Sequence, residues 1–227
     1  MRLSQRLAAE WLGTAFLLTA IIGSGIMAER LAHGDGALAL LCNSLATGTM
    51  LAVLILIFGP ISGAHFNPLV SLALFMRGEL TVATAASYVV AQLAGAFAGV
   101  LAAHAMFALP LMQVSMHARS GPGQCLSEAI ATFGLLMTIF GCAARNPDAT
   151  PYAIGAYIVA AFWFTASTSF ANPAVTLARA YSDTFAGIAP SNVPGFVLAQ
   201  CAGTLAAIAL APWLWETVLA KPANSQT

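Results

Sequence analysis

The sequence predicts an all-α membrane protein, in which six transmembrane helices and two re-entrant half-helices form an inverted repeat. The first observation is composition: of 227 residues, 59% are hydrophobic and 7% are charged, whereas a soluble domain carries about a quarter charged residues. The second is that the apolar residues fall in runs of about twenty, the length that crosses a hydrocarbon core about 30 Å thick. The third is that the two halves of the chain repeat each other. The bilayer is therefore the expected solvent.

Six apolar runs are long enough to span the membrane. They cover about residues 7–27, 37–58, 82–107, 125–144, 152–167 and 194–219. The first run follows basic residues, as in a signal peptide, but Glu10 interrupts it and the run is long enough to span, so we expect an uncleaved helix. Pro151 and Pro194 suit the first positions of the last two helices, where a backbone N–H is not needed.

Two further apolar segments, about 67–75 and 172–181, are too short to cross, and each begins with Asn-Pro. They are predicted to be half-spanning re-entrant helices. Non-helical backbone at membrane depth is tolerated only where protein buries it or where it lines a watery cavity. The segments that lead into them, 59–66 and 166–171, are therefore expected to line a pore.

An internal repeat relates residues 1–115 to residues 116–227. Acidic, amide and Asn-Pro positions recur at nearly constant offsets, which is hard to obtain by chance. The clearest pairs are Glu10 with Glu128, Asn67-Pro68 with Asn172-Pro173, and Gln92 with Gln200. Each half contains three spans, an odd number, so the second half enters the membrane from the opposite side and the repeats are inverted.

The distribution of basic residues predicts the orientation. Cytoplasmic loops carry an excess of Lys and Arg. With both termini in the cytoplasm, five basic residues lie inside and three outside: Arg2, Arg6, Arg77, Arg145 and Lys221 against Arg30, Arg119 and Arg179. The expected location is the inner (plasma) membrane of the cell, as a multi-pass protein with both termini cytoplasmic.

The two Asn-Pro pairs have a physical explanation as helix starts. Asn caps a helix, and Pro at the next position has its backbone angle already set. Because the repeats are inverted, the starts at Asn67 and Asn172 face each other at mid-membrane. A helix N-terminus carries about half a positive charge and unpaired N–H donors, so this meeting point repels cations and donates hydrogen bonds to neutral solutes.

Two carboxylates within spanning runs, Glu10 and Glu128, allow two interpretations. One is a proton relay. The other, favoured by their symmetric placement, is that each accepts hydrogen bonds from backbone amides of a re-entrant loop, with Gln92 and Gln200 sharing the task. The small residues Gly95 and Gly203 are expected to let helices approach closely.

Two histidines receive different interpretations. His65 lies two residues before Asn67 and is expected to line the pore, together with Gly63 and Ala64. His104 lies in an apolar run and is interpreted as a hydrogen-bonded helix residue.

Charge and cysteine usage exclude several classes of function. The formal net charge is zero and basic clusters are absent, so nucleic acid is not an expected partner. The cysteines lie singly in apolar runs, without metal or redox spacing. The sequence contains no nucleophile–base constellation and no phosphate-binding loop, so we expect no enzymatic activity, no cofactor and no metal site. The four cysteines are Cys42, Cys125, Cys142 and Cys201.

The chain resembles the aquaporin, or major intrinsic protein, family over nearly its whole length. The resemblance rests on the paired glutamates and on two motifs, Ser-Gly-Ala-His-Phe-Asn-Pro-Leu-Val at 62–70 and Asn172-Pro173-Ala174. The resemblance implies an aquaporin-like fold in a single channel domain, 1–227. It also implies a homotetramer in the lipid bilayer with one passive, bidirectional pore per subunit. A narrower resemblance is to bacterial aquaglyceroporin-like channels associated with arsenic handling.

Two departures from the family pattern concern selectivity. Leu69 follows Asn67-Pro68 where alanine is usual, and Val175 occupies the position at which most members carry the filter arginine. Transferring the family's filter by spacing gives Thr47, Ala160, Ser169 and Val175. Water-selective members place an aromatic residue, a histidine and the arginine at these positions, and none is present here.

Small filter side chains predict a wide, uncharged constriction. The expected solutes are small and neutral: glycerol, metalloid hydroxides such as arsenous acid, and water. Two alternatives remain open, a secondary transporter with broken helices and a mainly water-conducting aquaporin. A structural membrane protein with a closed pore is a further alternative.

Arg179 lies four residues after Val175, hence about one turn further along the same face. Its side chain could reach the vestibule of the pore, or it could pair with Asp183 and leave the filter uncharged. Both readings stay open, as does leakage of anions or protons through an arginine-free filter.

Overall fold

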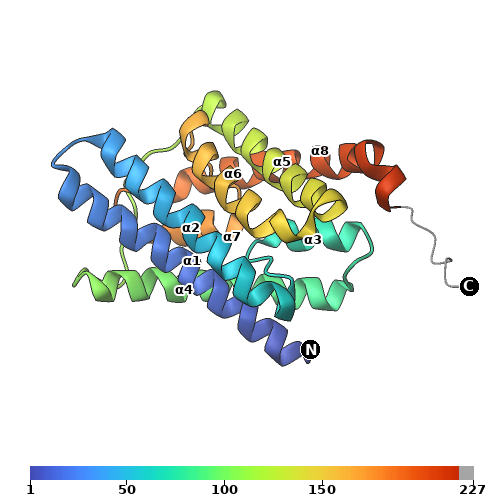
Figure 1. Cartoon of the computed structure of the whole chain (residues 1–227). Helices are drawn as coiled ribbons and strands as arrows, with labels where there is room; N and C mark the ends of the chain where they lie inside the picture. The colour runs from blue at the N-terminus through green and yellow to red at the C-terminus, as the bar shows by residue number, and fades with distance from the viewer. Residues whose placement is uncertain (220–227) are drawn as a thin grey trace, which may run out of the picture.

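The computed structural model describes residues 1–219, so Lys221, counted above among the cytoplasmic basic residues, lies outside the described part. Within that part the chain is helical, with connecting loops and without strands (Figure 1). The α-helices are α1 (Leu3–Ala32), α2 (Gly36–Ser62), α3 (Pro68–Met76), α4 (Val82–Met106), α5 (Pro122–Arg145), α6 (Thr150–Phe164), α7 (Pro173–Arg179) and α8 (Val193–Leu219). Two short 3₁₀ helices, η1 (Pro147–Ala149) and η2 (Pro190–Asn192), precede α6 and α8.

Local sequence signals set the ends of these helices. Asp35 accepts hydrogen bonds from the backbone amides of Ala37 and Leu38 in the first turn of α2, and the Thr81 hydroxyl accepts one from the amide of Thr84 in α4. Gly63 ends α2 in the left-handed conformation (φ 91°), which glycine adopts without a steric penalty. Pro122 stands in the first turn of α5. These capping residues therefore determine where the membrane-spanning helices begin and end.

Five helices, α1, α2, α4, α5 and the α8 region, are long and apolar enough to cross a membrane. The fifth predicted span, residues 152–167, corresponds to α6, which has 15 residues and is shorter than the other five spanning helices. The chain leaves the helix at Thr165 (φ −111°, ψ 137°) and enters the segment that leads to Asn172. Large apolar side chains such as Phe16, Val90 and Leu198 are exposed on the outer faces of the bundle. That surface suits a bilayer and confirms an integral membrane protein.

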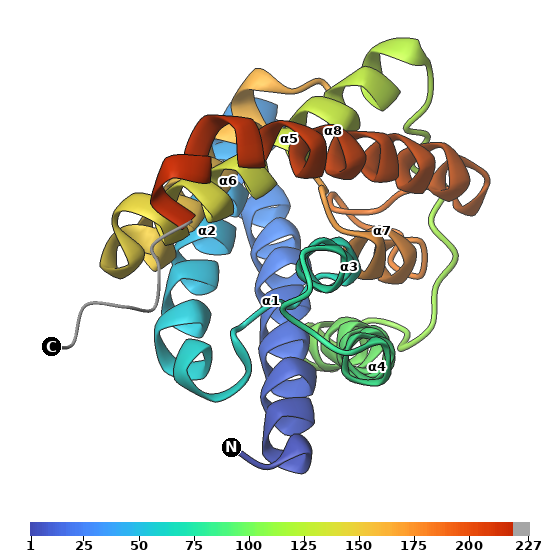
Figure 2. The same cartoon turned by 90° about the vertical axis from the view of Figure 1, so that its right-hand side faces the viewer.

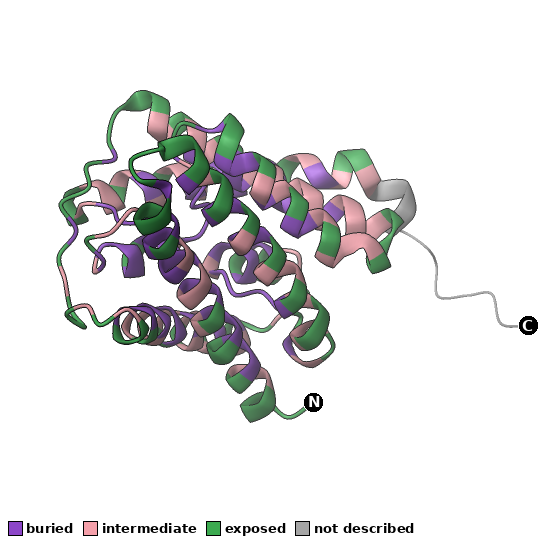
Figure 3. Cartoon of the chain, turned by 60° about the vertical axis from the view of Figure 1, so that its left-hand side comes forward, coloured by how far each residue is buried: buried purple, intermediate pink, exposed green. Residues whose placement is uncertain are grey.

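The packing repeats between the two halves. α1 packs on α4 as α5 packs on α8, and the contact between α2 and α6 joins the halves. Each half-helix, α3 and α7, touches both α4 and α8, and Figure 2 shows the two side by side between them. Buried residues face this centre, as Figure 3 shows.

Close helix approach depends on glycine at equivalent places. A Cβ added to Gly95 of α4 would overlap the Trp11 carbonyl of α1, and one added to Gly203 of α8 would overlap the Ala129 carbonyl of α5. Gly48 and Gly155 make a similar approach between α2 and α6. Small residues therefore set the spacing that leaves room for the half-helices.

Candidate pore and its two loops

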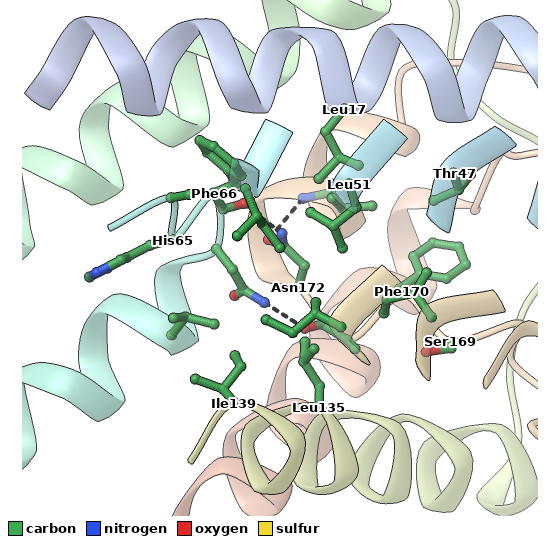
Figure 4. A pocket seen from close by; sticks show the side chains of 18 of the residues that line it. Leu17, Thr47, Leu51, His65, Phe66, Leu135, Ile139, Ser169, Phe170 and Asn172 are labelled. Atoms are coloured by element: carbon green, nitrogen blue, oxygen red, sulfur yellow. Dashed lines mark hydrogen bonds between the residues drawn. The ribbon is translucent and has the colours of Figure 1, made fainter. Parts of the chain in front are cut away.

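A cavity of about 130 Å³ runs through the centre of the bundle. Its lining comes from six helices and from both segments that precede the Asn-Pro pairs. In Figure 4, His65 lies at one end of the row of lining side chains, Thr47 and Ser169 lie at the other, and Asn172 lies between them. We call these the His65 end and the Arg179 end, since Arg179 also lines the cavity beside Phe170.

The Glu10 carboxylate holds the first loop from α1. It is fully buried and accepts hydrogen bonds from the backbone amides of His65 (3.0 Å) and Phe66 (2.8 Å). The hydroxyl of Ser62 (2.6 Å) and the Nε2 of Gln92 (2.8 Å) donate to the same carboxylate. Four donors around one buried carboxylate fix a segment that has no helical hydrogen bonds of its own.

Glu128 holds the second loop in the same way from α5. It accepts from the backbone amides of Phe170 (2.9 Å) and Ala171 (2.9 Å), and from Nε2 of Gln200 (2.5 Å). The two amides lie two residues and one residue before Asn172, the same offsets as in the first loop. Each carboxylate has its bonds directed at loop backbone, and this geometry favours the structural interpretation over a proton relay.

The loop backbones share an unusual conformation. Residues four, three and one before each Asn have positive φ, between 48° and 91°. Such angles are strained for any residue but glycine, and the hydrogen bonds to the two carboxylates hold them. The residues are Gly63, Ala64 and Phe66 in the first loop, and Thr168, Ser169 and Ala171 in the second.

The two Asn side chains connect the loops to each other. Nδ2 of Asn67 donates to the carbonyl of Ala171 (2.8 Å), and Nδ2 of Asn172 donates to the carbonyl of Phe66 (2.8 Å). Each Oδ1 caps its own helix, accepting at 2.9 Å from the amide of Leu69 or Ala174. Pro68 and Pro173 occupy the first helical positions.

Leu69 takes part in the first motif only through its backbone. Its side chain is buried, yet it is not among the residues that line the cavity. The exchange of the usual alanine for leucine therefore leaves the lining of the cavity unchanged.

The His65 end is lined by Gly63, Ala64 and His65. Nδ1 of His65 lies 3.0 Å from the hydroxyl of Ser71, and its ring meets Tyr88 edge-on with centroids 5.1 Å apart. These contacts hold the imidazole against the wall of the cavity. His104 lies elsewhere, buried between the carbonyl of Leu111 (2.9 Å) and the hydroxyl of Ser182 (2.9 Å), so its polar atoms are paired.

At the Arg179 end, three of the four predicted filter residues line the cavity: Thr47, Ser169 and Val175. The hydroxyls of Thr47 and Ser169 are buried and have no hydrogen-bond partner among residues 1–219. Buried hydroxyls normally have partners. Both residues line the cavity, and both hydroxyls have unused capacity to donate and accept hydrogen bonds.

The prediction for Ala160 was wrong, because the structure places it on the exposed outer side of α6, away from the cavity. The lining residues of this helix include Ile154, Ile158 and Phe162, which follow one another at a spacing of four. Ala160 lies two residues after Ile158, about 200° around the helix. The α6 contribution to this end is therefore large and apolar rather than small.

Arg179 is buried, with 2% of its surface exposed, and it lines the cavity. Its Nε donates to the carbonyl of Ala186, and its guanidinium carbon lies 3.3 Å from the centre of the Phe170 ring. Asp183 does not pair with it and instead accepts from the amide of Met116 (2.8 Å). Of the two readings of Arg179, the structure favours the one in which it faces the pore.

Arg119 is a site residue that sequence reasoning missed. It is buried in the loop between α4 and α5, and Nε donates to the carbonyl of Gly187 (2.8 Å) while Nη2 donates to that of Phe185 (3.2 Å). Its guanidinium lies 5.2 Å from the ring of Phe170. Burial lowers the pKa of Arg119 to about 10, so it stays protonated at neutral pH. A single arginine in a loop gives no sequence signal for this position.

The family model described as "Major intrinsic protein" matches residues 1–169. The chain is 52% identical over 225 residues to "Aquaglyceroporin AqpS" of Rhizobium meliloti (strain 1021), covering 99% of this chain and 95% of that protein. It is 30% identical over 174 residues to "Aquaporin Z" of Photorhabdus laumondii, covering 68% and 73%.

Among solved structures, the chain is similar to the X-ray structure of the aquaglyceroporin from Plasmodium falciparum. The TM-score is 0.73, with 97% of this chain and 100% of the other covered, at 21% sequence identity. At that identity the likeness shows the fold alone. It confirms the predicted fold class of membrane-spanning helices with two half-helices.

Proposed function

Since this chain belongs to the major intrinsic protein family, we propose that it passively conducts glycerol, metalloid hydroxides such as arsenous acid, and water. The chain is a channel of the aquaglyceroporin type for small solutes and not an enzyme. Thr47, Ser169 and Val175 are the residues proposed to select the solutes.

The observation that carries the proposal is that polar and apolar groups lie together at the Arg179 end. The hydroxyls of Thr47 and Ser169 have no hydrogen-bond partner within residues 1–219, and the apolar side chain of Val175 lines the same cavity. Hydroxyls both donate and accept hydrogen bonds, as the hydroxyl groups of glycerol and of arsenous acid do. The unpaired Thr47 and Ser169 hydroxyls can replace the water that such a solute loses. Val175 and the apolar face of α6 offer contact to the carbon chain of a polyol.

The centre of the pore supplies the barrier to cations. The half-helices α3 and α7 begin at Asn67 and Asn172, and their N-terminal ends both point to this centre. Positive helix ends disfavour a cation and leave a neutral solute unaffected. This arrangement supports a channel for uncharged molecules.

We further propose a homotetramer in the inner (plasma) membrane, with both termini cytoplasmic and the halves 1–115 and 116–227 as inverted repeats. The matching Glu, Gln and Asn contacts of the two loops support the repeat. An open apolar groove on the outside of the bundle, lined by residues of α1 and α2 such as Phe16 and Val53, supports contact with a neighbouring subunit or with lipid.

A permeability panel tests the solute assignment. Proteoliposomes would be compared with empty liposomes for water, glycerol, urea and neutral arsenous acid, using the parent, Val175→Arg and the uncharged control Val175→Leu. We expect the parent to conduct glycerol and arsenous acid, and Val175→Arg to lose these larger solutes while retaining water. Val175→Leu separates the effect of bulk from that of charge.

Three outcomes would contradict the proposal in different ways. Uptake of glycerol and arsenous acid at the rate of empty liposomes, with fast water flux, would indicate a mainly water-conducting pore. Lipid-level permeability to every solute would indicate a closed structural protein. Solute uptake that saturates at low concentration and requires a proton gradient would indicate a secondary transporter.

A further inference from the structure

We propose that Arg179, with the hydroxyls of Thr47 and Ser169, forms a binding site for small monovalent carboxylate anions at the Arg179 end of the pore. The inference rests on the proposed function, because it assumes that this cavity is the solute path. It adds a charged class of solute to the neutral ones.

The repeat identifies Arg179 as a pore residue. In the first half, the residues three and seven positions after Asn67 are Val70 and Leu74, and both line the cavity. In the second half, the same positions after Asn172 are Val175 and Arg179, and both line it as well. The position of Arg179 therefore faces the pore in each half, and only the second half places a charge there.

The guanidinium of Arg179 is held rigidly. Its Nε donates to the carbonyl of Ala186, and its plane lies close to the ring of Phe170. No hydrogen bond from Nη1 or Nη2 to another residue occurs in the described part of the chain. The edge formed by these two nitrogens is the fork that matches the two oxygens of a carboxylate.

The positive charge at this end is not neutralised within the protein. Within residues 1–219 the structure has one salt bridge, between Arg77 and Glu79. Asp183 accepts from the amide of Met116, and Glu128 is occupied by its own loop. Arg119 adds a second guanidinium beside Phe170.

A buried charge without a partner is unfavourable, so a bound anion would stabilise this end of the pore. Arg119 has its donors engaged by carbonyls of the surrounding loops, which leaves Arg179 as the guanidinium with a free edge. Because one guanidinium with a free edge supplies one unpaired positive charge, the site suits an anion with a single negative charge. Thr47 and Ser169 line the same end, and their hydroxyls have no hydrogen-bond partner within residues 1–219, so a side-chain rotation lets each donate to a carboxylate oxygen.

Formate is the probe that tests the site. Proteoliposomes at pH 7.5, where formate is ionised, would be given an inside-positive potential with a potassium gradient and valinomycin. Uptake of labelled formate and of glycerol would be measured in the same vesicles. The variants are Arg179→Met, Arg179→Lys and the control Arg30→Met. Arg30 is an exposed residue in the last turn of α1, the part of α1 that packs on Phe185, and it does not line the cavity.

We expect saturable formate uptake by the parent well above that of empty liposomes. Arg179→Met should lower the ratio of formate to glycerol uptake by about tenfold or more, the loss expected for one charge-assisted pair. Arg179→Lys should retain part of the ratio, and Arg30→Met should match the parent. If Arg179→Met fails to fold, Thr47→Val and Ser169→Ala should each lower formate uptake itself by roughly threefold, for one lost hydrogen bond.

The results distinguish the two proposals. Glycerol uptake with formate at the rate of empty liposomes would overturn the anion site and leave the neutral-solute channel intact. An unchanged ratio in Arg179→Met, or unchanged formate uptake in both hydroxyl variants, would also overturn the site. Absence of both fluxes in folded parent protein would overturn the proposed function, and the anion site with it.

Discussion

The loop before Asn67 and the loop before Asn172 have the same backbone supports, yet they present different chemistry to the two ends of the pore. Two residues before the Asn, the first loop has His65 and the second has Phe170. Seven residues after it, the first half has Leu74 and the second has Arg179. The scaffold is duplicated, whereas the lining side chains are not. Selectivity can therefore change at one end without any change in the support.

Removing a supporting carboxylate is the strongest test of the shared scaffold. Glu10→Ala and Glu128→Ala each leave two backbone amides and a glutamine without their acceptor. A hydrogen bond to a charged group contributes about 1.5–3 kcal/mol, so each variant should lose more than about 3 kcal/mol of stability. We expect neither to give monodisperse protein after detergent extraction, as judged by size-exclusion chromatography.

Glu79→Ala is the matched control, because this exposed carboxylate makes only a surface ion pair with Arg77. It should extract like the parent. If only one of Glu10→Ala and Glu128→Ala gave monodisperse protein, the carboxylate at that position would not be needed to support its loop. The two loops would then not share the same support.

A second test concerns the residue directly before each Asn, which is Phe66 in one loop and Ala171 in the other. The large ring fits because α1 has Gly13 beneath it, and a Cβ there would overlap the ring. The equivalent residue of α5 is Ala131, which is fully buried. Gly13→Ala should therefore destabilise the protein by about 1–3 kcal/mol through overpacking, measured as a lower thermal denaturation temperature.

The reciprocal change Ala131→Gly should be milder, at most about 1 kcal/mol, from helix propensity. On a Phe66→Leu background, Gly13→Ala should lose most of its effect, because the smaller side chain no longer fills the space over Gly13. An equal loss on both backgrounds would show that the ring is not the cause.

The smallest expected effect is on His117, which reports the positive charge at the Arg179 end. Burial lowers the pKa of His117 below its ordinary value of 6.5, and Arg119 and Arg179 lower it further, while Glu29 and Asp183 oppose this. The NMR titration of labelled histidine should show this pKa below 6.5. Arg179→Met should raise this pKa and Asp183→Asn should lower it, by loss of one charge each.

The sign of the pH effect on stability follows from the lowered pKa. The unfolded chain binds the proton of His117 more readily, so its contribution to stability is present above pH 6.5 and is lost as the pH falls below it. If Arg179→Met left the pKa of His117 unchanged, the Arg179 guanidinium would be too far from His117 to affect its protonation.

The features that could be predicted from the sequence are those that recur in both halves of the chain. Glu10 and Glu128, and Asn67 and Asn172, recur at fixed offsets, and each has a chemical role that few other residues could fill at membrane depth. The half-helices could be predicted because Asn-Pro, which indicates a turn when it occurs once, recurs at equivalent positions of the two halves before segments too short to cross the membrane.

Positions that depend on how helices rotate against one another could not be derived. Ala160 was assigned by spacing, but the face that α6 presents to the pore is set by its packing on α2 and α5, and it presents Ile158 and Phe162. The side-chain hydrogen bonds of Arg119 join residues 48 to 68 positions apart along the chain. Such contacts leave no local pattern in the sequence.

The reciprocal bonds of Asn67 and Asn172 have a consequence for biosynthesis. Asn172 donates to a carbonyl 106 residues earlier in the chain, and Asn67 donates to one 104 residues later. At about 5–20 residues per second, the ribosome needs roughly 5–20 s to make the intervening segment. Until then the first loop lacks both its acceptor and its donor, so the two halves must complete the centre together during membrane insertion.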